Sequence, residues 1–329
     1  MSPGNLVQRR GVLSFTLVRV VDFLGRPSFA RCPAWRSNFV AYGRREQATM
    51  TMQESVDHGT MTLSEFMSER SGIFAVDKPT GISSHAVVDR VRKAIVTEAR
   101  SQGIKVRKLL NVKCGHGGTL DPLASGVLLL AIGSATKKTK FFLSGRKTYV
   151  GSAELGSETD TQDSLGETTR TSEYSHITRE DVESVLDGFR GEILQTPPAF
   201  SAKMVKGKRA YELARQGEEV KLMPKKVMIT RLELSSFDNP HFEILVECSG
   251  GTYIRTLIQD IARAMNSCAH MIALRRTAQG PLTLEDTMPL DAKVCTDTVF
   301  KYVEEARAKV DPYVHEAMTR ESELHRDEP

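Results

Sequence analysis

A glycine-rich turn at residues 115–122 lies just ahead of an uninterrupted apolar run at residues 127–132. Such a run, flanked by turn residues, predicts a buried strand that follows a tight turn. The turn contains Asp121, which is the only carboxylate between Glu98 and Glu154, a stretch that holds ten basic side chains. A positive field suits a polyanion such as nucleic acid, and a lone acid within it could act on that polyanion. Asp-Pro is also a common turn pair, so the spacing alone leaves a plain solvated loop open.

The remaining hydrophobic patterns mix strands with amphipathic helices. Short apolar runs predict further strands at residues 72–76, 149–155, 227–234, 242–246 and 270–276. Helical spacing predicts a helix capped by Ser83 or Ser84, a second helix opened by Thr178, and a third over residues 254–265. These elements do not alternate strictly. We therefore expect an α+β fold with a mixed, largely antiparallel central sheet and flanking helices.

Three regions are expected along the 329 residues. Residues 1–70 form an arginine-rich extension without regular structure, and residues 71–290 form one folded catalytic domain. Residues 291–329 form a tail, helical over residues 299–310 and then polar. The tail is acidic, because it contains 6 basic and 10 acidic residues, a net charge of −4.

The composition of the extension bears on location. Residues 1–45 are rich in arginine and serine, contain one acid (Asp22), and carry an apolar stretch that arginine interrupts. This composition is typical of mitochondrial presequences, and the stretch is too short and too charged to span a bilayer. We expect a mitochondrial protein or, if the extension targets nothing, a nuclear or cytoplasmic one, without membrane attachment.

Several chemistries find no support in the motifs. There is no Walker A sequence, no Rossmann glycine spacing, no G-x-S-x-G and no H-E-x-x-H. Five widely spaced cysteines form no C-x-x-C pair and no zinc-type grouping with histidine. We therefore expect a reducing compartment and no structural metal.

Residues 115–128 resemble the signature of the TruB family of tRNA pseudouridine synthases. Further segments match that family in the same order: residues 77–84, 147–150, 195–203 running into 207–217, 251–256 and 274–276. The match covers about residues 72–280. Each fragment alone is short, but six in order make the resemblance specific.

The resemblance implies an enzyme that isomerises uridine to pseudouridine within RNA. The N1–C1′ bond breaks, the uracil turns and C5 bonds to C1′, so no atom is gained and no cofactor or metal is required. By resemblance, Asp121 is the single catalytic carboxylate, which either adds to C1′ or takes the 2′ proton. Arg255 is the arginine that pairs with it. Tyr149 lies against the uracil near C5, where a proton must leave.

Other residues are expected to contact RNA. By resemblance, His116 supports the flipped nucleotide at a phosphate or a neighbouring base, and Tyr253 and Leu274 line the uracil pocket. Lys78 is expected as a structural or RNA contact. Residues 195–226 resemble the family's thumb, an RNA-clamping insertion that closes over the RNA arm. Its expected phosphate contacts are Lys203, Lys208 and Arg209.

The chain departs from the family pattern in two places. Val150 stands where many bacterial members have arginine, and the residues after Leu290 are too few for the bacterial RNA-binding PUA domain. The short end, the motif variant Thr119 and the arginine-rich leader indicate a eukaryotic-type member of the family. The implied partner is the T-arm of tRNA, with the T-loop uridine at position 55 as target. T-loop-like stems in messenger RNA are a further expectation, and the protein is expected to be a monomer.

Two other functions stay open. A catalytically idle relative of the same fold would bind and fold tRNA, although it would have no need for Asp121, Tyr149 and Arg255 together. A glycoside or nucleoside hydrolase usually needs two carboxylates that flank one bond. The stretch around Asp121 offers one, unless a distant acid folds in.

Overall fold

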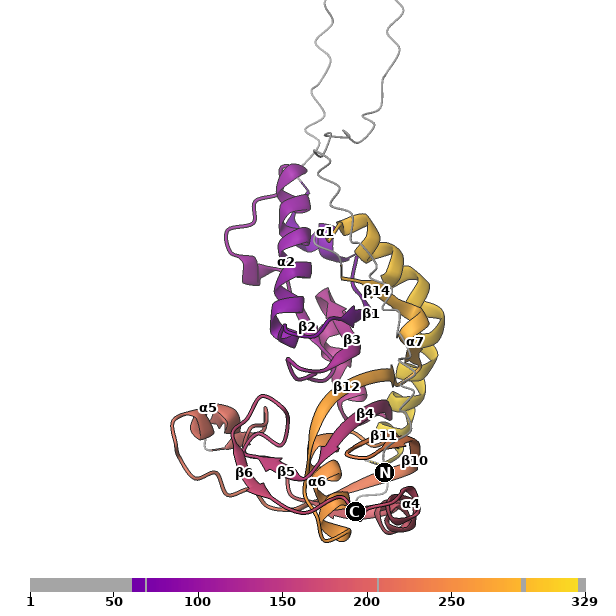
Figure 1. Cartoon of the computed structure of the whole chain (residues 1–329). Coiled ribbons are helices and arrows are strands. Elements are labelled where there is room, and N and C mark those ends of the chain that lie inside the picture. Colours follow the sequence, from indigo (N-terminus) through magenta and orange to yellow (C-terminus); the bar gives the residue numbers. More distant parts are fainter. Residues whose placement is uncertain (1–60, 69, 206, 291–293, 325–329) are drawn as a thin grey trace, which may run out of the picture. The chain divides into compact units, whose positions relative to one another are not determined.

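The structure is a computed structural model that describes residues 61–68, 70–205, 207–290 and 294–324. The chain divides into two units, Met1–Asp57 and His58–Pro329, and every element below belongs to the second (Figure 1). The expected presequence lies outside the described residues.

Helices and strands follow one another without a regular βαβ alternation. The helices are α1 Leu63–Ser68, α2 Ser84–Ser101, α3 Lys140–Ser144, α4 Arg179–Leu186, α5 Ala210–Arg215, α6 Ile254–Ala264 and α7 Thr296–Leu324. The strands are β1 Gly72–Lys78, β2 Cys114–His116, β3 Ser125–Ile132, β4 Lys147–Leu155, β5 Ser157–Thr159, β6 Thr168–Thr171, β7 Gly191–Gln195, β8 Met204–Val205, β9 Lys208–Arg209, β10 Lys225–Asp238, β11 His241–Cys248, β12 Ala269–Gln279, β13 Leu282–Thr283 and β14 Thr287–Pro289.

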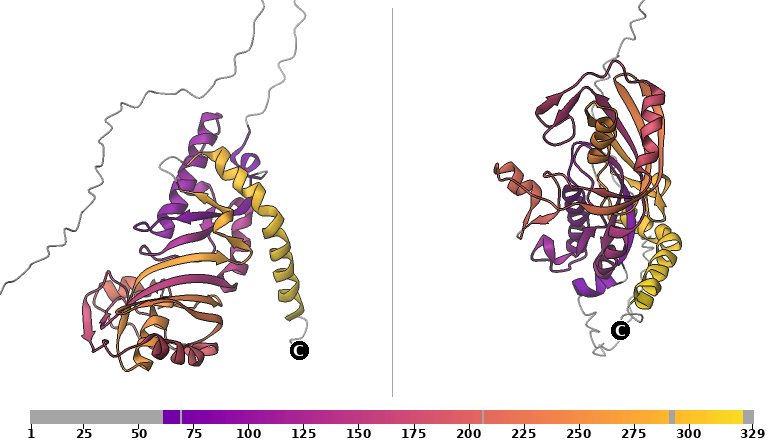
Figure 2. Two further views of the ribbon diagram at one scale, coloured as in Figure 1. Left: turned by 45° about the vertical axis from the view of Figure 1, so that its right-hand side comes forward. Right: turned by 90° about the horizontal axis from the view of Figure 1, so that it is seen from below.

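One sheet organises the described residues. Its ten strands run in the order β14-β1-β3-β12-β4-β11-β10-β7, with β2 added to β3 and β13 to β12. All pairings in it are antiparallel except β1 with β14 and β3 with β12. Figure 2 shows the strands crossing one after another, with α7 along one side. The predicted mixed, largely antiparallel sheet is confirmed.

Two apolar clusters hold helices on this sheet. One joins β1 and β3 to α2 and α7, and the other joins β4, β10, β11 and β12 to α4 and α6. Local signals explain where helices begin. The Ser83 hydroxyl accepts a hydrogen bond from Ala86 N at the start of α2, and Thr178 forms a capping box with Asp181 at the start of α4, as the sequence predicts.

Both ends of the expected domain extend further than predicted. Within the supposed extension, α1 buries Phe66 and Met67. At the other end the predicted helix over residues 299–310 is too short, because α7 continues to Leu324. Val310 and Val314 are buried against the first cluster on either side of Pro312, so packing outweighs the helix-breaking tendency of this proline. No described helix is long and apolar enough to cross a membrane.

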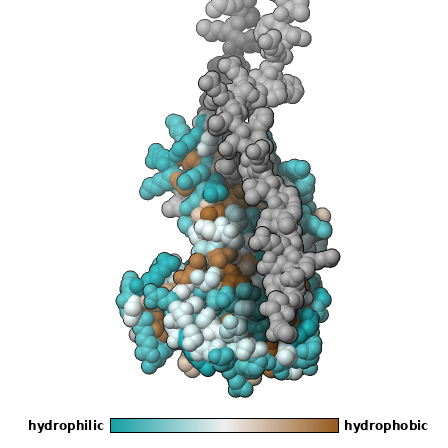
Figure 3. Space-filling view, in the orientation of Figure 1, coloured by the Kyte–Doolittle hydropathy of each residue, from teal (hydrophilic) through white to brown (hydrophobic). Residues whose placement is uncertain are grey.

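The expected thumb is an excursion between two paired strands. Gln195 at the end of β7 pairs with Lys225 at the start of β10, so the segment between them leaves the sheet and returns at the same point. It contains the β8–β9 hairpin and α5, which stand away from the sheet in Figure 1. In the space-filling view, the surface is hollowed beside this excursion and apolar residues gather in the hollow (Figure 3).

Candidate active site

The turn that carries Asp121 is held by four elements. Ser84 Oγ of α2 accepts from Leu120 N and donates to Leu120 O, both at 2.8 Å. Gly81 N, just after β1, donates to Pro122 O at 2.8 Å. Further bonds to the turn come from side chains of β12 and from β3: Arg276 to Gly118 O and Thr119 O, Gln279 to Gly117 O, and Gly117 N to Leu129 O. The main chain around Asp121 is therefore fixed by groups distant in sequence.

Arg255 pairs with Asp121, as the resemblance implies. The distance from Arg255 Nε to Asp121 Oδ2 is 3.0 Å, and the arginine side chain is 5% exposed against 35% for the aspartate. Arg255 also donates to Thr161 O at 2.6 Å and to Phe200 O at 2.9 Å. One guanidinium thus joins the Asp121 turn, the loop after β5 and the base of the thumb.

A second carboxylate folds in from outside the stretch around Asp121. Asp163 Oδ2 lies 3.7 Å from Arg255 Nη1, and the residue is buried. Its Oδ1 accepts from Thr161 Oγ1 at 2.7 Å and from Leu165 N at 3.1 Å. These bonds orient the Asp163 carboxylate, which supports Arg255. Asp121 differs, because no hydrogen bond to its Oδ1 occurs among the described residues.

Strand pairing places Tyr149 beside a buried arginine. Tyr149 of β4 lies opposite Arg276 of β12, so both side chains are on the same face of the sheet. Arg276 is fully buried, and its Nε donates to Val127 O at 2.6 Å. Burial raises the pKa of Tyr149, and the neighbouring Arg276 opposes that rise. The phenol therefore stays neutral over the ordinary pH range.

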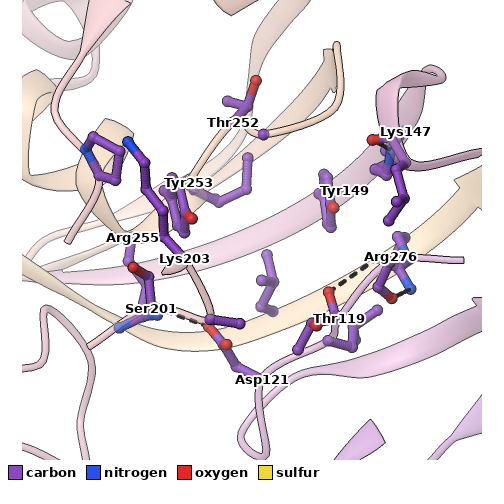
Figure 4. Close-up of a pocket in the computed structure, with 18 of the residues that line it drawn as sticks. Thr119, Asp121, Lys147, Tyr149, Ser201, Lys203, Thr252, Tyr253, Arg255 and Arg276 are labelled. Atoms are coloured by element: carbon purple, nitrogen blue, oxygen red, sulfur yellow. Dashed lines mark hydrogen bonds and ion pairs between the residues drawn. The ribbon is translucent and has the colours of Figure 1, made fainter. Parts of the chain in front are cut away.

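These residues line a pocket of about 410 Å³ (Figure 4). Leu274 is two residues before Arg276 on β12 and lies opposite Gly151, so it shares the face of Tyr149. Tyr253 comes from the start of α6, where Gln195 bonds to both its N and O. The predicted pocket residues Asp121, Tyr149, Arg255, Tyr253 and Leu274 all line this one cavity. It combines aromatic and aliphatic walls with a carboxylate–guanidinium pair.

Lys147 also lines the pocket, although sequence reasoning gave it no role there. Its Nζ donates to Phe142 O, Leu143 O and Gly145 O at 2.7–3.0 Å, at the end of α3. Burial lowers the pKa of Lys147 to about 8. This cation therefore does not reach the surface as part of the expected positive field.

His116 lines a neighbouring pocket that shares Asp121, Arg255 and Arg209 with the first. Its Nδ1 is buried and has no hydrogen-bond partner among the described residues. Burial, with Arg276 nearby, lowers the pKa of His116. The ring is therefore neutral at pH 7, which suits contact with a base better than an ion pair with a phosphate.

The expectation of an RNA contact for Lys78 is wrong. Its side chain is fully buried, and Nζ donates to Pro79 O, Ile82 O and, at 3.4 Å, Pro122 O. Burial lowers the pKa of Lys78 to about 8, although the nearby Asp121 carboxylate acts to raise it. The lysine fastens β1 to the turn of Asp121, and this is the structural alternative expected for it.

The thumb cations differ in position. Lys203 and Arg209 line the first pocket, and Arg209 lines the second as well. Lys208 is exposed on β9 and lines neither. Arg209 Nη1 donates to Ala202 O at 2.6 Å, within the thumb itself.

Arg276 is the main site residue that sequence reasoning missed. It belongs to the matched segment 274–276, and the two-residue strand period puts it on the face of Leu274. That period could have identified it. Lys147 carried the same signal, because it belongs to the matched segment 147–150 and is two residues before Tyr149 on β4. Asp163 carried no comparable signal, because its position depends on contacts distant in sequence.

Comparisons with known proteins agree with this geometry. The TruB family pseudouridylate synthase N-terminal domain matches residues 106–254, and the tRNA pseudouridylate synthase B C-terminal domain matches residues 255–315. The chain is 42% identical over 237 residues to pseudouridylate synthase TRUB1 of Homo sapiens, covering 71% of this chain and 68% of that protein. It is 44% identical over 216 residues to tRNA pseudouridine synthase B of Phocaeicola vulgatus, covering 66% of this chain and 88% of that protein.

A solved structure shows the same fold. A chain in a Cbf5–Nop10–Gar1 complex is similar with a TM-score of 0.50 and 28% identity. The similarity covers 77% of this chain and 61% of the solved chain.

Proposed function

Because the chain belongs to the TruB family of pseudouridine synthases, we propose that it isomerises uridine to pseudouridine in tRNA, with Asp121 as the catalytic carboxylate. The Asp121–Arg255 pair beside an apolar pocket carries the assignment of this residue. Arg255 binds Oδ2 and leaves Oδ1 for the ribose. Either route, addition to C1′ or removal of the 2′ proton, needs one such oxygen.

The walls of the pocket suit a detached uracil. Tyr149, Tyr253 and Leu274 give it flat and aliphatic surfaces, against which a base can turn without leaving the wall. After C5 has bonded to C1′, the proton on C5 must leave and N1 must gain one, so the overall reaction is an isomerisation. In this proposal the phenolic proton of Tyr149 passes to N1 and the phenol oxygen accepts the proton from C5, and Arg276 beside it favours release of the phenolic proton.

We propose the T-arm of tRNA as the RNA bound and the uridine at position 55 as the target, with T-loop-like stems in messenger RNA as a second substrate. A base inside a folded loop must be extruded, which costs a few kcal/mol. The thumb cations Lys203, Lys208 and Arg209 would offset that cost by contacts with phosphates. We propose that one copy of the chain suffices, and that the arginine-rich residues 1–45 direct it to mitochondria.

The test is to incubate the full chain with a T-arm stem-loop RNA, digest the RNA and measure pseudouridine. The wild type is expected to form it, whereas Asp121→Ala and the isosteric Asp121→Asn are not. Normal turnover by Asp121→Asn would refute the assignment. Bound RNA without product from the wild type would favour the idle chaperone, and free uracil would favour a hydrolase.

Asp77→Asn is a matched control. The Asp77 carboxylate pairs with Arg275 at 2.9 Å and is 37% exposed, close to the 35% of Asp121, but it lines neither pocket. This variant is expected to keep its activity.

A further inference from the structure

Six exposed cations gather on and beside α2, away from both pockets. They are Arg90, Lys93, Lys105, Arg107, Lys108 and Lys113, and we refer to them as the α2 basic surface. In the described part of the chain none of the six forms an ion pair. The nearby acids are engaged elsewhere, since Asp89 pairs with Arg92 and Glu98 accepts from Gln102.

The segment that presents four of these cations is built into the fold. Ile104, Val106 and Val112 are buried in the first apolar cluster, so the alternating Lys105 and Arg107 point outward. Arg100 of α2 donates twice to Val106 O, at 3.2 and 2.8 Å. Arg92 donates to Val112 O and Cys114 O at 3.3 and 2.8 Å. The hydrogen bonds from Arg92 and Arg100 and the buried aliphatic side chains thus hold the cations in place along the helix.

Helix geometry extends the same surface onto α2. Seven residues separate Lys93 from Arg100, which puts their side chains within roughly 20° of each other around the helix. Lys93 therefore lies on the side along which the segment runs. Arg90 is exposed as well and lies three residues before Lys93, about 60° from it around the helix. Asp89 and Glu98 are only partly exposed, so the cations dominate the charge of this surface.

The surface also has a definite position relative to the catalytic turn. Ser84 at the start of α2 bonds to Leu120, next to Asp121. With a rise of about 1.5 Å per residue, Arg90 is about 9 Å along the helix from Ser84, and the 18-residue helix ends about 27 Å away. The cations thus begin near the site and continue away from it along α2. Figure 1 shows this helix and the segment that follows it.

We propose that the α2 basic surface binds the phosphate backbone of a second part of the tRNA, outside the hairpin whose loop enters the pocket. This inference rests on the proposed function, because it assumes that the substrate is a folded RNA. Unpaired cations repel one another and attract counterions. A phosphate backbone would release these counterions, and the gain falls as salt rises.

The experiment compares two RNAs, a T-arm hairpin and an unmodified full-length tRNA transcript. The variant replaces Lys105, Arg107, Lys108 and Lys113 with glutamine together, and leaves the buried aliphatic residues intact. The wild type is expected to bind tRNA more tightly than the hairpin. The variant is expected to lose about tenfold in tRNA affinity and to keep the wild-type affinity and turnover for the hairpin. The salt dependence of tRNA binding should also become shallower, by roughly 0.7–0.9 in log–log slope for each phosphate that the variant no longer binds.

A control variant with the same change in net charge distinguishes the loss of this surface from a general loss of positive charge. It replaces Arg179, Lys226, Arg231 and Lys301 with glutamine, which are exposed cations already paired with Glu183, Glu192, Glu233 and Glu305. This control should leave the preference for tRNA unchanged. Equal losses for both RNAs, or no loss for tRNA, would overturn the inference. Failure of the wild type to convert the hairpin would instead refute the proposed function.

Discussion

The Asp121 turn and the thumb border the same pocket, yet they are held in opposite ways. Residues 117–122 form hydrogen bonds with Gly81 after β1 and with α2, β3 and β12. In the thumb, the hydrogen bonds of the described residues 202–217 reach no further than Ser201 and Glu218, which also belong to the thumb. The base of the thumb is held from outside, because Arg255 donates a hydrogen bond to Phe200 O.

The difference matches the two proposed tasks: the turn positions the Asp121 carboxylate, and the thumb closes over the RNA. A carboxylate that must meet one ribose carbon benefits from a fixed backbone, because a misplacement of about 1 Å can cost about 10²-fold in rate. A segment that must admit an RNA arm and then close on it benefits from few external bonds. Changes in the turn should therefore lower kcat, and changes in the thumb should raise KM.

The largest effect is expected for Arg276, which joins the turn to the strand of Tyr149. Arg276→Met leaves Gly118 O, Thr119 O and Val127 O without their donor, so stability should fall by about 3 kcal/mol or more. Arg276→Lys keeps the charge and is expected to fold. Its single-turnover rate at saturating RNA should be lower by about 10²-fold.

A purely structural role for Arg276 would leave the proton step unaffected. If Arg276 instead helps Tyr149, C5 deprotonation becomes slower in Arg276→Lys, and a deuterium at C5 should slow this variant more than the wild type. An isotope effect equal to that of the wild type would limit Arg276 to holding the turn.

A smaller effect is expected for Ser84→Ala, which removes both bonds to Leu120. Stability should fall by about 1–3 kcal/mol, and kcat by about tenfold, with KM unchanged. Ser101→Ala is the matched control, because Ser101 Oγ donates to an exposed carbonyl at the other end of the same helix. Equal losses in the two variants would show that the turn is not held through Ser84.

The thumb should respond in KM. Lys208→Ala, or Arg209→Ala, is expected to raise KM by about three- to tenfold with kcat nearly unchanged, because each removes a cation for phosphate. Lys221→Ala, which removes an exposed lysine paired with Glu219, should change neither. A loss confined to kcat would contradict the assignment of the thumb to closing.

The smallest effect concerns pH and His116. Burial holds its folded-state pKa below the unfolded value of about 6.5, so the unfolded chain takes up the proton first as pH falls. The contribution of the neutral His116 ring to the free energy of unfolding is therefore complete above the unfolded pKa and is lost as the pH falls below it. His116→Asn should reduce the fall in Tm between pH 7.5 and 5.5 by under about 2 °C. Replacing the exposed His176 with asparagine should leave the fall unchanged.

Local sequence signals predicted much of the fold. The cap at Ser83, the capping box at Thr178 and the helix that begins at Ile254 are encoded within a few residues, and the structure has them. α7 was predicted too short, because its continuation past Pro312 depends on distant packing.

The site was predicted mainly through the resemblance. The matched segments place Asp121, Tyr149 and Arg255 together, and the structure brings them to one pocket. The burial of Lys78 and the contribution of Asp163 could not be predicted in this way. The burial of Lys78 depends on the carbonyl groups that surround its Nζ, and the role of Asp163 depends on its proximity to the Arg255 guanidinium. Both contacts exist only after the sheet has formed.

The bonds from Arg276 to the turn of Asp121 also have a consequence for synthesis on the ribosome. Arg276 emerges about 155 residues after Asp121, which at 5–20 residues per second is a delay of roughly 8–30 s. Until β12 arrives, β3 and β4 lack the strand that lies between them, and their edges stay open. A chain truncated before residue 276 should therefore be aggregation-prone as well as inactive, and chaperones would act on the nascent protein in this interval.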